Sequence, residues 1–199
     1  MNTKGALSLL GWMLPLMAAC EREPGLAPDQ PTASLKQQQV VIAQTPSYTA
    51  LDAGAAGGTQ GSLHLWVNTG GQVPRSADAF IGSVPVFGYA WVDLATGLGV
   101  VAVIHPLIGR DSRQNPKGWH THPVQLSAGA AFDFCIAGLG TAQGGIGIRD
   151  DVLRLNIALE QAGLSAGVLD VAAAFVVQPD AGCAATGLGV DVLDAESLT

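Results

Sequence analysis

The strongest constraint on the fold is the alternation of residue types in short segments that are separated by glycine turns. In residues 86–94, small aliphatic residues occupy every second position, and A-T-G then leads into an apolar run at 98–104. This is the pattern of a β-hairpin. Residues 153–160, L-R-L-N-I-A-L-E, contain helix-favouring side chains, but their strict period of two predicts a half-buried strand. The sequence therefore predicts a chain made of strands.

About eight such segments follow one another from Leu63 onward, with frequent glycine turns between them. The pattern predicts an all-β domain over residues 61–199, with the fold of an antiparallel β-sandwich. Phe87, Tyr89 and Trp91 lie on one face of their strand, where they form either a platform for stacking a ligand or part of the core. Because aromatic residues dominate the interiors of such folds, we favour the core.

The beginning of the chain has the layout of a secretory signal peptide. Lys4 precedes an apolar run at 6–17, which is too short to cross roughly 30 Å of hydrocarbon as a helix. The run ends in L-M-A-A-C, which resembles the lipobox of bacterial lipoproteins. The resemblance implies a signal peptide at 1–19 and a lipid on Cys20, which becomes the first mature residue. The alternative is an ordinary signal peptide that is cut after Ala19.

Residues 20–60 are predicted to be a flexible, lipid-anchored tether, because they are rich in proline, glutamine, glycine and alanine and offer little to bury. The anchor implies a periplasmic or cell-surface protein whose partner is a membrane. Glu21 does not resemble the aspartate that commonly signals retention at the inner membrane, so the outer membrane is preferred. Export also implies an oxidising compartment, where Cys135 and Cys183 are expected to form a disulfide.

The charge balance and the motifs exclude several classes of function. Removing Lys4 with the signal peptide leaves eight of the nine basic residues against sixteen acidic ones, which argues against nucleic-acid binding. The sequence contains no phosphate-binding G-x-x-x-x-G-K and no C-x-x-C. Nothing in it supports catalysis beyond weak motif similarities. The sequence therefore favours a binding or structural module of the cell envelope, with an envelope protein as a candidate partner.

The segment between 105 and 122 is the first place to expect a binding site, because it departs from the apolar alternation. Polar connections on a rigid β-scaffold are where function usually resides. The alternative is a solvated loop whose polar residues form turns. The candidate binding residues are His105, Arg110, Asp111, Arg113, Lys117 and Trp119.

His120 and His122 alternate within this segment. On a strand, residues two apart project from the same face, so their imidazoles could share one zinc or copper ion. His105, His64 or Asp133 could supply a third ligand. The alternative is an edge strand without a metal.

Two metal-binding families show a local resemblance. G-W-H-T-H-P at 118–123, followed by Asp133, resembles the JAMM-type metalloproteases and implies zinc ligands at His120, His122 and Asp133. Ala130 stands where that family has a serine, and no glutamate precedes the motif outside the tether. The histidine pair is also similar to that of copper/zinc superoxide dismutase. No histidine follows His122, which leaves that family's remaining ligands without counterparts.

Overall fold

The computed structural model describes residues 47–49, 51–57, 61–77, 86–105, 118–140, 144–158, 160, 163–164 and 168–198. These residues form ten strands and one short 3-10 helix, η2, and every strand pair is antiparallel. The predicted all-β class is confirmed. None of the helical residues described belongs to a segment with the length and hydropathy needed to cross a membrane. The elements are η2 (Ser47–Thr49), β1 (Leu51–Gly57), β2 (Ser62–Thr69), β3 (Val86–Val92), β4 (Leu98–Ile104), β5 (His120–Ala128), β6 (Phe134–Leu139), β7 (Gly144–Arg149), β8 (Val152–Ala158), β9 (Val171–Pro179) and β10 (Leu188–Ser197).

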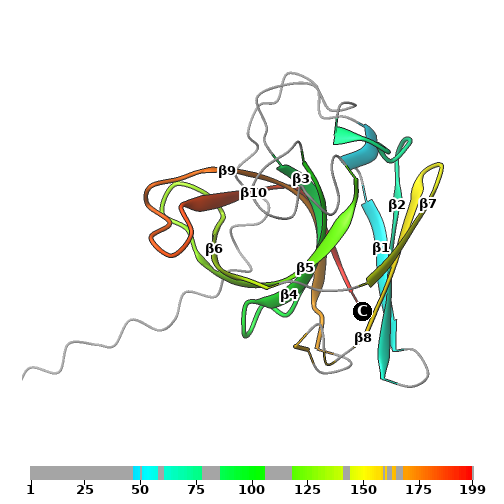
Figure 1. Ribbon diagram of the computed structural model, residues 1–199, viewed down its shortest axis with the longest axis horizontal. Helices are drawn as coiled ribbons and strands as arrows, with labels where there is room; N and C mark the ends of the chain where they lie inside the picture. The colour runs from blue at the N-terminus through cyan, green and yellow to red at the C-terminus, as the bar shows by residue number, and fades with distance from the viewer. Residues whose placement is uncertain are drawn as a thin grey trace, which may run out of the picture. The chain divides into compact units, whose positions relative to one another are not determined.

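The strands are divided between a closed barrel and an open sheet (Figure 1). Six strands close the barrel in the order β10-β6-β5-β4-β3-β9, and the other four form a sheet in the order β1-β2-β8-β7. The predicted antiparallel sandwich is not confirmed, because β10 pairs with both β9 and β6 and so closes one of the two sheets into a barrel. An alternating pattern is compatible with either arrangement, since closure depends on which distant strands pair.

One wall of the barrel, made by β3, β4 and β9, is buried on both faces. Its outward residues pack against the inner face of the open sheet in one apolar cluster that joins the two layers. Phe87, Tyr89 and Trp91 belong to this cluster and are at most 3% exposed, which confirms that they are core residues. The Tyr89 hydroxyl donates a hydrogen bond to the carbonyl oxygen of Tyr48 at 2.8 Å, and burial raises its pKa.

The open sheet confirms one prediction and corrects another. Residues 152–158 form β8, with buried residues at every second position from Leu153, as their period of two predicts. The ordered fold begins before residue 61, however, because Leu51–Gly57 form β1 and pair with β2. The predicted tether therefore includes a strand. β1 is poor in large apolar residues, but Gly54 lies against the indole of Trp66, where a Cβ atom would meet the ring at 2.1 Å.

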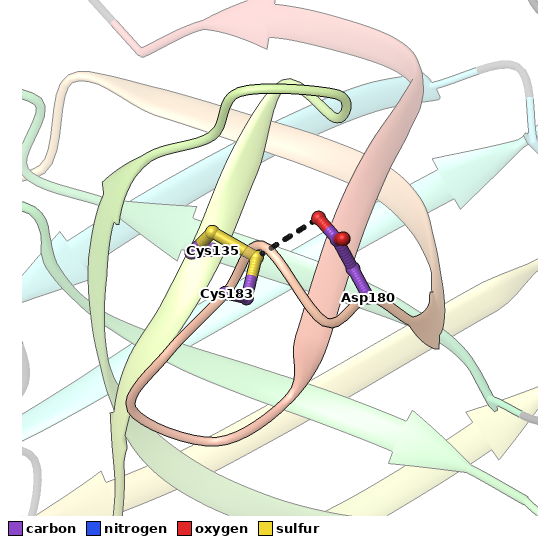
Figure 2. A group of neighbouring side chains, drawn as sticks. All are labelled: Cys135, Asp180 and Cys183. Atoms are coloured by element: carbon purple, nitrogen blue, oxygen red, sulfur yellow. Dashed lines mark hydrogen bonds between the residues drawn. A yellow bond between two sulfur atoms is a disulfide. The ribbon is translucent and has the colours of Figure 1, made fainter.

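The barrel is closed at the seam between β6 and β10, and the predicted disulfide lies there. The two strands pair at only two positions, Cys135 opposite Gly189 and Phe134 opposite Val190. Cys135 is joined to Cys183 in the β9–β10 loop, as Figure 2 shows. A Thr186 hydroxyl donates to the Ile136 carbonyl in the same region. The disulfide therefore reinforces the barrel where its backbone pairing is shortest.

Candidate functional site

The barrel interior contains a cavity of about 370 Å³ that is partly open to the surface. Among the described residues that line it, all are apolar except His105 and His122. The apolar lining consists of Val86, Ala90, Val92, Leu94, Val101, Val103, Val124, Leu126, Phe134, Ile136, Leu139, Val171, Ala173, Phe175, Val177, Pro179, Leu188, Val190 and Val192. The volume falls within the range of about 300–1,000 Å³ that is usual for small-molecule sites.

The cavity exists because the inward positions of the shared wall carry small side chains. Ala90 on β3 lies directly opposite Ala173 on β9, and valines occupy most of the remaining inward positions. Phe175 is the exception, and its ring lies against Gly88, which has no Cβ to displace it. A barrel with larger residues at these positions would fill its own interior.

An apolar interior of this size is unfavourable when only water is in contact with it, because burial of apolar surface is a dominant favourable term in folding. Water is a poor occupant, because an apolar cavity offers it few hydrogen-bonding partners. The cavity is therefore the feature of the barrel that most needs a functional explanation.

Three histidines lie together at one end of the cavity. On β5, His120 is opposite Val103 and His122 is opposite Val101, so their side chains share the inward face with these two cavity-lining valines. His105 directly follows β4. The His120 ring is nearly perpendicular to both others, with centroids 4.7 Å from His105 and 5.0 Å from His122. All three are buried, with 5–8% of their surface exposed.

Backbone carbonyl groups fix the protonation pattern of two of these rings. His120 Nδ1 lies 3.0 Å from the Gly118 oxygen, and His122 Nδ1 lies 2.8 Å from the Gly140 oxygen. A carbonyl oxygen only accepts hydrogen bonds, so each Nδ1 carries the proton. In the neutral ring, Nε2 then carries the lone pair. His120 Nε2 lies 3.1 Å from His105 Nε2.

The structure brings together only part of the predicted set of metal ligands. His105 joins His120 and His122, but Asp133 lies at the other end of β6, where its Oδ2 accepts the Val192 N–H at 2.8 Å. Gly140, the partner of His122, is seven positions after Asp133, which is about 23 Å along a strand. The ligand set implied by the JAMM resemblance is therefore not assembled, because that set requires Asp133.

The fourth histidine and the predicted loop residues do not belong to this cluster or lie outside the described residues. His64 is exposed on β2 of the open sheet, outside the barrel. Trp119 is close to the cluster in sequence, stacks on Tyr89 with centroids 5.4 Å apart, and donates to the Pro74 carbonyl at 2.6 Å. The other predicted loop residues, Arg110, Asp111, Arg113 and Lys117, lie outside the described residues, as does Cys20.

A second cluster resembles a metal site in its residue types alone. In the described part of the chain, Cys135, Asp180 and Cys183 are the set of three whose ligand atoms lie within 4.8 Å of one another. The two sulfurs are bonded to each other, so neither is the thiolate that a metal requires. Asp180 Oδ2 lies 3.4 Å from Cys183 Sγ (Figure 2), and its Oδ1 accepts the Gly182 N–H. Asp180 therefore serves the turn that carries the disulfide.

No family model matches the chain, and no curated protein or solved structure matches it either. The site is therefore interpreted from its own geometry.

The sequence contained two further signals. Residues 86–92 carry no charged side chain on either face, which indicates a strand with a second buried surface, here the cavity wall. Gly163 to Gly167 read G-L-S-A-G, which matches the nucleophile-elbow pattern G-x-S-x-G. Ser165 lies outside the described residues.

Proposed function

We propose that the barrel domain binds a small, predominantly apolar molecule in its interior. The cavity of about 370 Å³, with apolar walls and two histidines, is the observation that carries this proposal. Apolar walls supply affinity through burial, at roughly 25 cal/mol per Å². The histidines at one end supply the few polar groups that orient a ligand. A purely structural module would be expected to fill its barrel with larger side chains.

A matched pair of substitutions tests the proposal. Ala90→Phe places a ring in the cavity, whereas Ala185→Phe makes the same change at an exposed position of the β9–β10 loop. The probe is phenylnaphthylamine, a neutral fluorophore whose emission rises in apolar surroundings. We expect saturable binding by the wild type and the Ala185→Phe variant, and binding at least about tenfold weaker, or about 1.4 kcal/mol, for Ala90→Phe.

The stability of the variants separates occupancy from misfolding. Because Ala90→Phe fills a void, its thermal midpoint should equal or exceed that of the wild type. Ala173→Phe, on the opposite strand, provides a second filled variant. Unchanged probe binding by either folded variant would place the probe elsewhere and contradict the proposal.

We also propose that the domain is exported and attached to a membrane through a lipid on Cys20, in the periplasm or at the cell surface. The disulfide supports an oxidising compartment. The test is incorporation of a labelled fatty acid. Cys20→Ser should abolish the label, and Met17→Leu, which introduces the commoner lipobox residue, should retain it. Labelling of Cys20→Ser would contradict the anchor.

A further inference from the structure

The end of the cavity holds three buried histidines, which is more than the orientation of an apolar ligand requires. A single hydrogen-bonding side chain would orient an apolar ligand. Instead, three imidazole rings are packed edge to face at centroid separations of 4.7 and 5.0 Å. Each is at least nine-tenths buried, and burying polar rings is favourable only where specific partners compensate for lost hydration.

The hydrogen bonds of this cluster have the pattern found around metal-binding histidines. Such a ligand usually donates its second ring N–H to a backbone carbonyl or carboxylate, which fixes both the tautomer and the orientation of the ring. His120 and His122 each donate Nδ1–H to a carbonyl, from Gly118 and Gly140 respectively. Their Nε2 atoms are thereby the nitrogens with ligand character.

The separation of two of these nitrogens matches that of two ligands on one ion. With bonds of about 2.0–2.1 Å to a tetrahedral ion, two nitrogens lie about 3.3 Å apart. The Nε2 atoms of His105 and His120 are 3.1 Å apart. Because His120 Nε2 carries a lone pair in the neutral ring, this contact requires a cation, or a proton on His105, between the two rings.

We propose that His105 and His120 bind one late first-row transition-metal ion through their Nε2 atoms. In the present arrangement, the ligand atoms of the three rings do not all lie within 4.8 Å of one another. His122 therefore stays on the Gly140 carbonyl and borders the ion without binding it. Imidazole ligands suit copper and zinc, and the Irving–Williams order gives copper(II) the higher affinity.

The proposal is independent of apolar ligand binding, although the two sites adjoin. His122 lines the cavity, so a bound ion would lie at the cavity's polar end. Metal binding is measured on the histidine variants and apolar binding on the cavity-filling variants, so failure of one proposal is distinguished from failure of the other.

The fourth histidine supplies the matched control. The full chain, purified without a histidine tag and freed of metal, is titrated with Cu²⁺, Zn²⁺ and Co²⁺ by calorimetry, and the Co²⁺ complex is examined by visible absorption. We expect one ion per chain and affinity at least about 100-fold lower in His105→Ala and His120→Ala. His64→Ala should retain wild-type affinity, because His64 is exposed on β2.

Folding of the variants is checked by near-ultraviolet circular dichroism. His120→Gln, which keeps a polar side chain of similar length, replaces His120→Ala if the latter does not fold. His122→Ala should keep the cobalt spectrum of the wild type, because the His122 ring is not a ligand. The proposal is overturned if the wild type binds no ion at micromolar concentration, or if His64→Ala weakens binding as much as folded variants of His105 and His120.

Discussion

Replacing both bridged cysteines by alanine should destabilise the barrel by about 4 kcal/mol. Cys135 and Cys183 are 48 residues apart in the sequence. Closing a loop of that length lowers the conformational entropy of the unfolded chain, which stabilises the folded state by about 4 kcal/mol. The native structure has a second reason to need the bond. β6 and β10 pair at two positions, whereas β9 and β10 pair at nine.

The measurement is urea unfolding followed by intrinsic tryptophan fluorescence. Cys20→Ala is the control, because it removes the third cysteine, which lies outside the bridge; all three proteins are prepared without the lipid. The double variant should unfold at a lower urea midpoint, with the control unchanged. Phenylnaphthylamine affinity should also fall if the seam loosens the cavity wall.

A loss smaller than about 1 kcal/mol would refute this reasoning, because it would lie well below the usual range for removal of a native disulfide. The seam would then be held by its other contacts. Those contacts are the Thr186 hydrogen bond to Ile136 and the acceptance of the Val192 N–H by Asp133.

Two further substitutions test charge and space in the same barrel. Burial, and then the charge of Asp133, raise the pKa of Asp191, so the folded state holds this proton more tightly than the unfolded chain, and stability falls as pH rises through the raised pKa. Asp191→Asn should therefore raise the thermal midpoint at pH 7 and give no gain at pH 3; an equal gain at both would contradict the assignment. Gly88→Ala should cost about 1–3 kcal/mol in urea unfolding, because its Cβ would meet the Ala102 carbonyl oxygen at 2.6 Å and the Phe175 ring at 2.7 Å. Gly145→Ala, which meets nothing within 4 Å, should cost less, and equal losses would show that close packing is not the cause.

β8 was predictable from the sequence because burial of one face imposes a period of two. β3 and β4 are buried on both faces. They were predictable from the alternation of aromatic and smaller residues in β3, and from the turn that leads into the apolar run of β4. Closure of the barrel was not predictable, because the period is the same in an open sheet. β1 was missed since its small residues carry no apolar pattern, and its pairing with β2 is a tertiary effect.

The histidine cluster was predictable in part. The i, i+2 spacing correctly placed His120 and His122 on one face, because strand geometry is local. The sequence could not predict that His105, and not Asp133 or His64, would be their neighbour. That depends on the register of β4 with β5. The cavity could not be predicted from the sequence. Its volume arises from many small residues that point inward, and the inward direction is defined only when the barrel closes.

The wall shared by the barrel and the open sheet has a consequence for how this fold can diversify. In β3, successive residues serve different compartments: Ala90 faces the cavity, whereas Tyr89 and Trp91 face the packing layer between barrel and sheet. A mutation at an inward position therefore changes the shape of the interior without altering the residues that hold the two layers together. Natural or laboratory selection could use this separation to vary ligand preference at even-numbered positions of β3 while the odd-numbered ones preserve the scaffold.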